Sequence, residues 1–322
     1  MANTNWTLLT PPSQGAIAIV QLAGTPGITP ELEKLTGRST WNDGSLYLVN
    51  IPDIDEAVAV KINDNLAHIM PHGGVHILRK LAIRFEELGI EQTDEPQYPE
   101  AKDLVEVAML QTLSIAKSPL AVELLLQQPP KLRGVTPSQD DVKRSAILNH
   151  LITPPKVVLL GAPNTGKSTL MNALTKLDTS IVHHLPGATR DAVGARINCN
   201  GLVIDLYDLP GFRESEDPIE QEAIQLAKTI ADEATLTILI TDYETNWLET
   251  TRDSIQVATK SDIKPRDGAD ICVSAQTGEN MQELSLAIRD AIIPPEVLGS
   301  DEPWFFEGYR PIELKPQSTY NT

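Results

Sequence analysis

A chain of 322 residues, 41% of them hydrophobic, can form about two or three domains that each bury a core. No apolar run approaches a membrane span and no signal peptide is visible, so a cytoplasmic protein with no membrane association is expected. The formal net charge of −18 disfavours generic RNA or DNA binding, which would need a basic face. Cys199 and Cys272 lie in strand-like segments and are expected to be packing thiols rather than a disulfide.

Residues 1–100 are predicted to form a small α/β domain. Apolar or alternating segments predict four strands, at residues 16–22, 46–51, 56–62 and 66–70. A helix is predicted from Val75 to Leu88, because Gly89 then ends the helical pattern. Residues 101–153 are predicted to be a helical connector, with helices at 103–116, 120–127 and 138–151.

Residues 154–293 are predicted to form a nucleotide-binding domain organised around a phosphate-binding loop. The segment 161–168 follows an apolar strand and precedes a helical pattern, which is the setting that such a loop needs. Its backbone N–H groups and the helix N-terminus would bind phosphates, and the Lys167 ammonium would reach the terminal ones. The predicted nucleotide-binding residues here are Gly161, Asn164, Thr165, Gly166, Lys167, Ser168 and Thr169.

The rest of this domain alternates strands and helices, which predicts an α/β fold with a mostly parallel sheet and helices on both faces. A hairpin turn is predicted at Asn200-Gly201, between strands at 192–199 and 202–208. Further strands are predicted at 235–241, 254–258 and 270–274, and helices at 218–234 and 280–293. The loops at the carboxyl edge of such a sheet are the expected place for a ligand.

Two motifs beyond the phosphate loop predict a Mg²⁺ site. The motif Asp208-Leu209-Pro210-Gly211 follows a strand, which suits an Asp that holds Mg²⁺ through water and a Gly near the γ-phosphate. Thr189, in the segment 187–191, is placed to supply a second hydroxyl ligand. The predicted Mg²⁺ residues are therefore Ser168, Thr189 and Asp208.

The motif Thr259-Lys260-Ser261-Asp262 favours guanine over adenine. The Asp262 carboxylate can accept hydrogen bonds from both N1–H and the 2-amino group of guanine, a donor pair that adenine lacks. The Lys260 stem would pack over the base, and the backbone at Ser274-Ala275 would reach the guanine O6. The expected ligands are GTP and GDP.

Residues 294–322 form a proline-containing tail with an aromatic cluster made of Trp304, Phe305, Phe306 and Tyr309. Docking onto the protein's own surface is the favoured explanation, and a partner site is the alternative.

These motifs, in this order, resemble those of translation-factor-related GTPases, and most closely those of the MnmE (TrmE) family of tRNA-modification GTPases. The resemblance is carried by residues 161–168, 181–191 and 208–227, while residues 10–20 and 72–74 are similar to that family's N-terminal domain. It extends from the start of the chain to about residue 293. It implies GTP hydrolysis, with Lys167 and Thr189 in the catalytic site.

The resemblance also implies how this site handles water and charge. Phe212 stands where many GTPases have a water-positioning Gln, and in this family an acidic residue that matches Glu220 acts instead, through water. Without the resemblance, Glu220 would be an ordinary acidic residue in the first turn of a helix. The family binds K⁺ with an Asn that matches Asn164 and with carbonyls that match residues 183–187, although Asn164 could instead brace its own loop.

The sequence departs from the family in several places. The helical region is short, and the second helical half and the C-terminal Cys motif are absent, so a divergent, shortened member is expected. The segment Gln21-Leu22-Ala23-Gly24 lacks the family's Arg and Ser, which weakens the expectation of folate binding. The resemblance further implies a homodimer, an FAD-dependent partner subunit and tRNA wobble-uridine modification, and leaves direct contact of this acidic chain with tRNA an open question. The alternative from another class is a non-enzymatic GTP-dependent switch or scaffold.

Overall fold

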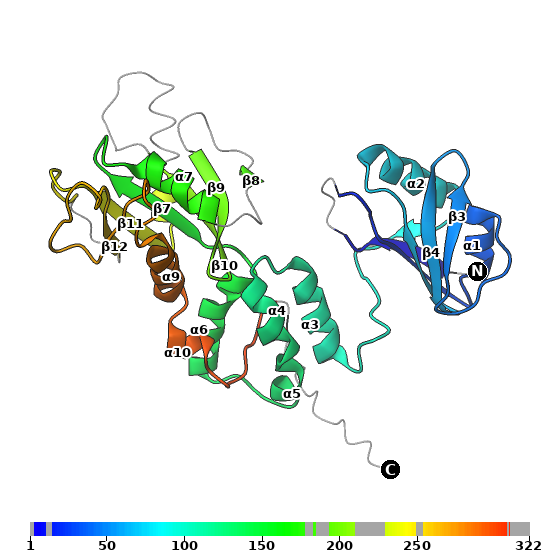
Figure 1. Cartoon of the computed structure of the whole chain (residues 1–322). Coiled ribbons are helices and arrows are strands. Elements are labelled where there is room, and N and C mark those ends of the chain that lie inside the picture. The colour runs from blue at the N-terminus through cyan, green and yellow to red at the C-terminus, as the bar shows by residue number, and fades with distance from the viewer. Residues whose placement is uncertain are drawn as a thin grey trace, which may run out of the picture. The chain divides into compact units, whose positions relative to one another are not determined.

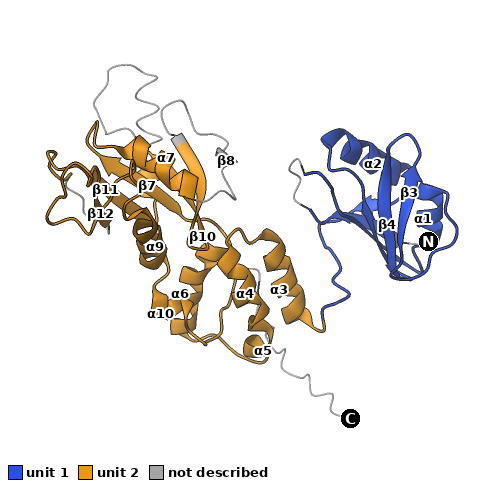
Figure 2. Ribbon diagram, viewed as in Figure 1, with its two compact units in different colours: residues 1–101 blue, residues 102–322 orange. Residues whose placement is uncertain are grey.

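The computed structural model describes residues 3–10, 15–177, 183–184, 193–209, 229–248, 254–307 and 309 (Figure 1). The chain divides into two compact units, residues 1–101 and 102–322, which Figure 2 distinguishes by colour. Each unit has its own sheet and is described by itself. Within the described residues, no helix has both the length and the apolar composition to cross a lipid bilayer.

The first unit contains a six-stranded sheet in the order β3-β4-β5-β2-β1-β6. Its strands are β1 (Asn3–Leu8), β2 (Val20–Thr25), β3 (Leu46–Ile51), β4 (Asp55–Asn63), β5 (Leu66–Met70) and β6 (Glu91–Gln92), and its helices are α1 (Thr29–Thr36) and α2 (Val75–Glu87). The predicted strands at 46–51 and 66–70 are confirmed, and the predicted strand at 56–62 lies within β4. The predicted strand at 16–22 instead begins at Val20. Before it, Ile17 forms an isolated bridge with His72, and the Leu9 N–H donates to the Ile19 carbonyl, without forming a continuous strand.

Both helices of the first unit contribute to one hydrophobic cluster with the sheet. Leu32 and Leu35 of α1 are buried there, together with Leu81 and Phe85 of α2. The Phe85 ring lies 5.2 Å, centroid to centroid, from that of Trp6 on β1. This cluster explains why a short domain of mixed elements forms a separate unit.

The second unit begins with α3 (Leu104–Ile115), α4 (Pro119–Leu126), α5 (Gln128–Leu132), α6 (Gln139–Leu148) and the 3₁₀ turn η1 (Asn149–Leu151). The Asp103 carboxylate accepts hydrogen bonds from two N–H groups in the first turn of α3. Ser138 and Asp141 form a reciprocal capping box at the start of α6. These caps satisfy N–H groups that a helix start would otherwise leave without partners, and they fix where the helices begin.

The remainder of the second unit contains a seven-stranded sheet in the order β13-β12-β11-β7-β10-β9-β8. The strands are β7 (Lys156–Gly161), β8 (His183–His184), β9 (Val193–Cys199), β10 (Leu202–Asp208), β11 (Leu236–Thr241), β12 (Ser254–Ala258) and β13 (Ile271–Cys272). The strands from β13 to β10 pair in parallel, and β9 and β8 join antiparallel. The predicted hairpin is confirmed, because Asn200 and Gly201 both adopt the positive φ that a tight turn of this kind requires.

Alternate residues of β7 face two different layers, as a sheet covered on both faces requires. Val157 and Leu159 join the cluster that contains α7 (Lys167–Leu177) and α9 (Met281–Ile292). Val158 belongs to a second cluster with Ala231, which lies in the helical residues 229–232. The predicted α/β fold, with a mostly parallel sheet between helical layers, is therefore confirmed.

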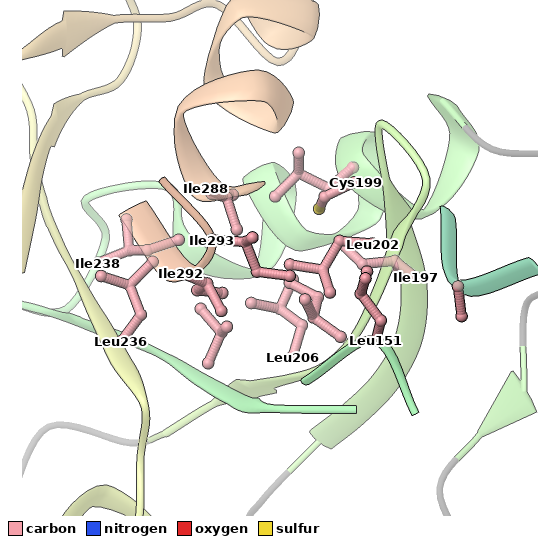
Figure 3. Packing of buried hydrophobic residues seen from close by; sticks show 14 of the residues in the cluster. Leu151, Ile197, Cys199, Leu202, Leu206, Leu236, Ile238, Ile288, Ile292 and Ile293 are labelled. Atoms are coloured by element: carbon pink, nitrogen blue, oxygen red, sulfur yellow. The ribbon is translucent and has the colours of Figure 1, made fainter. Parts of the chain in front are cut away.

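The helices before β7 share their core with the seven-stranded sheet and the helices that cover it. Figure 3 shows Leu151 of η1 packed among Ile197, Leu202 and Leu206 of β9 and β10, with Ile292 of α9 close by. The segment predicted as a helical connector is thus packed against the domain that follows it. Cys199 lies buried in the same cluster and forms no disulfide with the half-buried Cys272.

The aromatic residues after the short helix α10 (Pro295–Leu298) lie on the helices of the same chain. Trp304 and Phe306 are 0% and 1% exposed. The Trp304 backbone N–H donates to Gln128 Oε1 at 2.8 Å, and its Nε1–H donates to Asn149 Oδ1 at 3.0 Å. Docking onto the protein's own surface is confirmed for Trp304 and Phe306, which leaves these two side chains no exposed surface for a partner.

Replacing Trp304 with Ala should destabilise the second unit strongly. The substitution removes a fully buried ring and the hydrogen bond from its Nε1–H to Asn149, and we expect a loss of about 3–5 kcal/mol in the free energy of unfolding. Urea unfolding followed by circular dichroism measures this loss. Phe305→Ala is the matched control, since Phe305 is only half-buried, and equal losses for the two variants would contradict the assignment.

Candidate functional site

The phosphate-binding loop joins β7 to α7 and is pressed against the neighbouring strand β11. A Cβ atom at Gly161 would lie only 2.3 Å from the Ile240 carbonyl oxygen, so only glycine fits at this position. Asn164 adopts a positive φ of 65°, which turns the loop back toward the start of the helix. The loop is therefore shaped by contacts with the sheet as well as by its own residues.

The loop backbone surrounds the ammonium group of Lys167. Lys167 Nζ donates to the Gly161 and Ala162 carbonyl oxygens, at 3.0 Å each. The buried Thr165 hydroxyl donates to the Ala162 carbonyl at 2.8 Å and closes the turn. This arrangement holds a positive charge at the N-terminus of α7, where the helix dipole also favours an anion.

Two of the three predicted Mg²⁺ residues are in direct contact. Ser168 lies in the first turn of α7 and Asp208 is the last residue of β10, yet Ser168 Oγ donates to Asp208 Oδ2 at 2.5 Å. A hydroxyl and a carboxylate offer the hard oxygen ligands that Mg²⁺ prefers, so this pair fits the ion. The other predicted residues of this part, Thr189, Gly211 and Glu220, lie outside the described residues.

The loop after β12 binds the phosphate loop through its side chains. The buried Thr259 hydroxyl donates to the Thr165 carbonyl at 2.5 Å and lies 3.1 Å from the Thr241 carbonyl. Lys260, whose φ is 60°, reaches across so that its Nζ donates to the Asn164 carbonyl at 3.0 Å. The residues predicted to read the base and those predicted to bind phosphate therefore form one continuous structure.

The remaining predicted base-reading residues differ in exposure, since Ser274 is buried and Ala275 is half-buried. Asp262 is exposed, which leaves its carboxylate accessible to a base. The Ser274 N–H donates to the Glu279 carbonyl at 3.2 Å, whereas the Ala275 N–H makes no hydrogen bond with the described residues. Of the pair Ser274-Ala275, the structure thus leaves the Ala275 N–H to meet a base oxygen.

Asp242, a buried residue directly after β11, is a further residue of this site that was not predicted from the sequence. Its Oδ2 accepts a hydrogen bond from Lys260 Nζ at 2.7 Å, and its Oδ1 accepts from the Thr245 N–H at 2.9 Å. Burial acts to raise the pKa of Asp242, but the hydrogen bonds from Lys260 and Thr245 outweigh it and hold that pKa well below its usual value. The available signal was its position, because a carboxylate at a parallel strand's carboxyl end lies at the edge where the other motifs meet.

The chain is similar to known GTPases over much of its second unit. The family model described as 50S ribosome-binding GTPase matches residues 156–271. The tRNA modification GTPase MnmE of Cereibacter sphaeroides is 34% identical over 200 residues, which cover 59% of this chain and 45% of that protein. The MnmE of Methylobacterium radiotolerans is 41% identical over 143 residues, which cover 42% of this chain and 32% of that protein. The chain thus matches less than half the length of these relatives.

Among solved structures, Era of Aquifex aeolicus, bound to GDP and aluminium fluoride, is 26% identical with a TM-score of 0.35. The match covers 47% of this chain and 59% of that one.

Replacing Thr259 with Val should lower stability by about 1–3 kcal/mol, because Val keeps the shape but removes the hydroxyl that bonds the Thr165 carbonyl. Thr259→Ser keeps the hydroxyl and should lose less. Urea unfolding of the two variants measures the difference. A Val variant as stable as the Ser variant would show that this bond does not hold the two loops together.

Proposed function

We propose that this chain, which carries a GTPase domain that resembles those of MnmE proteins, binds GTP and hydrolyses it to GDP and phosphate. The observation that carries the proposal is the set of bonds joining Thr259 and Lys260 to the phosphate loop, beside the contact between Ser168 and Asp208. Together these bonds assemble a base-reading loop, a phosphate loop and a pair of Mg²⁺ ligands at one edge of a parallel sheet.

In this proposal the chain's own groups bind and orient the phosphates. Backbone N–H groups of the loop and of the first turn of α7 surround the phosphate chain, and the Lys167 ammonium exchanges its carbonyl partners for phosphate oxygens. Ser168, Asp208 and Thr189 would hold Mg²⁺. When bound, Mg²⁺ would neutralise charge on the β- and γ-phosphates.

Guanine is selected by Asp262, whose exposed carboxylate accepts from N1–H and the 2-amino group, while the Ala275 N–H donates to O6. The Lys260 stem covers one face of the base. Glu220 orients the attacking water, in the role that Phe212 cannot fill. Asn164, which is exposed on the phosphate loop, would supply a K⁺ ligand, as the resemblance to MnmE proteins implies.

GTP hydrolysis should be faster in KCl than in NaCl of equal ionic strength, and Asn164→Ala should remove that difference.

Glu220→Ala should lower kcat by roughly 100-fold, because it removes the group that positions the water. The rate of phosphate release measures both the salt dependence of hydrolysis and the kcat of Glu220→Ala. As a control, the affinity of Glu220→Ala for GDP, measured by titration, should stay unchanged. Equal rates in the two salts would exclude K⁺, and a fully active Glu220→Ala protein would exclude that residue.

The proposal extends to tRNA, because the relatives named above are tRNA modification GTPases. In that case GTP hydrolysis would serve wobble-uridine modification together with an FAD-dependent partner, and the first unit would form a homodimer. Expressing this chain in a bacterial strain that lacks its own MnmE should restore the modified uridine, which mass spectrometry of digested tRNA detects. An inactive Lys167→Ala variant is the control, and no restoration by the active chain would exclude this role.

A further inference from the structure

The contact between Asp242 and Lys260 has no part in the function proposed above. Asp242 is 6% exposed and stands directly after β11, whereas Lys260 stands after the neighbouring strand β12. Their side chains meet across the edge of the sheet, with Lys260 Nζ 2.7 Å from Asp242 Oδ2. A partly buried ion pair at a strand edge needs a reason, because each charge loses hydration there.

The Asp242 carboxylate is held in place by its surroundings. Its Oδ1 accepts from the N–H groups of Glu244 and Thr245, at 3.2 and 2.9 Å, which folds residues 242–245 into a turn. The guanidinium of Arg266 donates to the Asp242 carbonyl at 2.6 Å and to the Thr245 carbonyl at 2.5 Å. With its Oδ1 held by the turn and the backbone of the turn held by Arg266, the carboxylate can act as a rigid anchor for a flexible side chain.

The Lys260 side chain is anchored at its far end by two groups. Its Nζ donates to Asp242 Oδ2 and to the Asn164 carbonyl of the phosphate loop. An unrestrained lysine would have to lose much of its rotamer freedom before its stem could lie against a base. With the ammonium held at both acceptors, that freedom is already lost before the nucleotide binds.

We propose that Asp242 is a positioning residue that sets the affinity for nucleotides through Lys260, without taking part in the choice of base. The inference rests on the proposed function, in which the Lys260 stem covers one face of the base. Stacking on an aliphatic stem does not depend on the groups at the base edge, so its loss weakens all purine nucleotides alike. The Asp262 carboxylate, by contrast, meets the base edge and decides between purines.

The substitution Asp242→Asn removes the ion pair with Lys260 while keeping the hydrogen bonds of the turn. The amide oxygen can still accept from the N–H groups of Glu244 and Thr245, but the amide nitrogen then faces the Lys260 ammonium and cannot accept from it. The turn is retained and the anchor for Lys260 is lost. Glu244→Gln is the matched control, because Glu244 lies in the same turn, is exposed, and uses only its backbone among the contacts of the described residues.

The experiment measures the dissociation constants of GDP and IDP by titration calorimetry on the full chain. IDP lacks only the 2-amino group of guanine, so the ratio of the two constants reports on the reading of the base edge. We expect Asp242→Asn to weaken GDP and IDP by the same factor, roughly two- to tenfold, as for one newly mobile side chain. Asp262→Asn should weaken GDP more than IDP, and Glu244→Gln should change neither.

A double-mutant cycle tests whether Asp242 acts through Lys260. In a Lys260→Met background, Asp242→Asn should cause no further weakening, because the ammonium that it anchors is gone. Equal weakening in both backgrounds would overturn the proposal and leave Asp242 a purely structural role. A change in the GDP-to-IDP ratio on Asp242→Asn would also overturn it.

If Asp242→Asn does not fold, as judged by circular dichroism, Lys260→Met alone carries the test and should weaken GDP and IDP equally. A change in their ratio on Lys260→Met would then overturn the proposal. Wild-type protein that binds neither nucleotide would overturn the proposed function itself. The two failures are distinguishable. If only the inference about Asp242 is wrong, the wild-type protein still binds GDP, whereas failure of the proposed function leaves it without GDP binding.

Discussion

Two hydrogen bonds, from Thr259 Oγ1 to the Thr165 carbonyl and from Lys260 Nζ to the Asn164 carbonyl, join the two loops of the candidate site. A nucleotide has its base at one end and its phosphates at the other, so the loops that bind them must keep a fixed separation. Here that separation is set by hydrogen bonds within the protein, and the close approach of Gly161 to β11 fixes the phosphate loop against the sheet. A site whose two loops are already bonded to each other needs little rearrangement to bind its ligand.

The positions of these loops depend in turn on the sheet and on the helices that precede it. The Ser118 hydroxyl, at the start of α4, accepts a hydrogen bond from the Val203 N–H of β10 at 3.0 Å. Leu120 of α4 packs so closely on the hairpin that a Cβ atom at Gly201 would lie 2.6 Å from its Cγ. Since β10 ends at Asp208, the helical segment helps to position a predicted Mg²⁺ ligand.

What the sequence could predict is what short segments determine by themselves. The phosphate loop has a fixed spacing of glycines, Lys and Ser, and the turn at Asn200-Gly201 uses residues that tolerate a positive φ. The strand β1 was not predicted, because most of its residues are polar. It becomes a strand by pairing with β2, where Trp6 lies opposite Leu22. Asp242 was missed for a similar reason, since its role depends on a lysine 18 residues later in the chain. Contacts between distant segments leave no local pattern.

The docking of Trp304 gives the second unit a closed chain path. The chain enters the nucleotide-binding domain from η1, leaves it through α9, and returns to the helices that it left, where Trp304 bonds with Asn149 of η1 itself. The entrance and the exit of the domain are therefore fastened to the same place. A force that pulls the two flanks apart would first have to break this fastening, so the domain is mechanically isolated from tension applied through its neighbours in the chain.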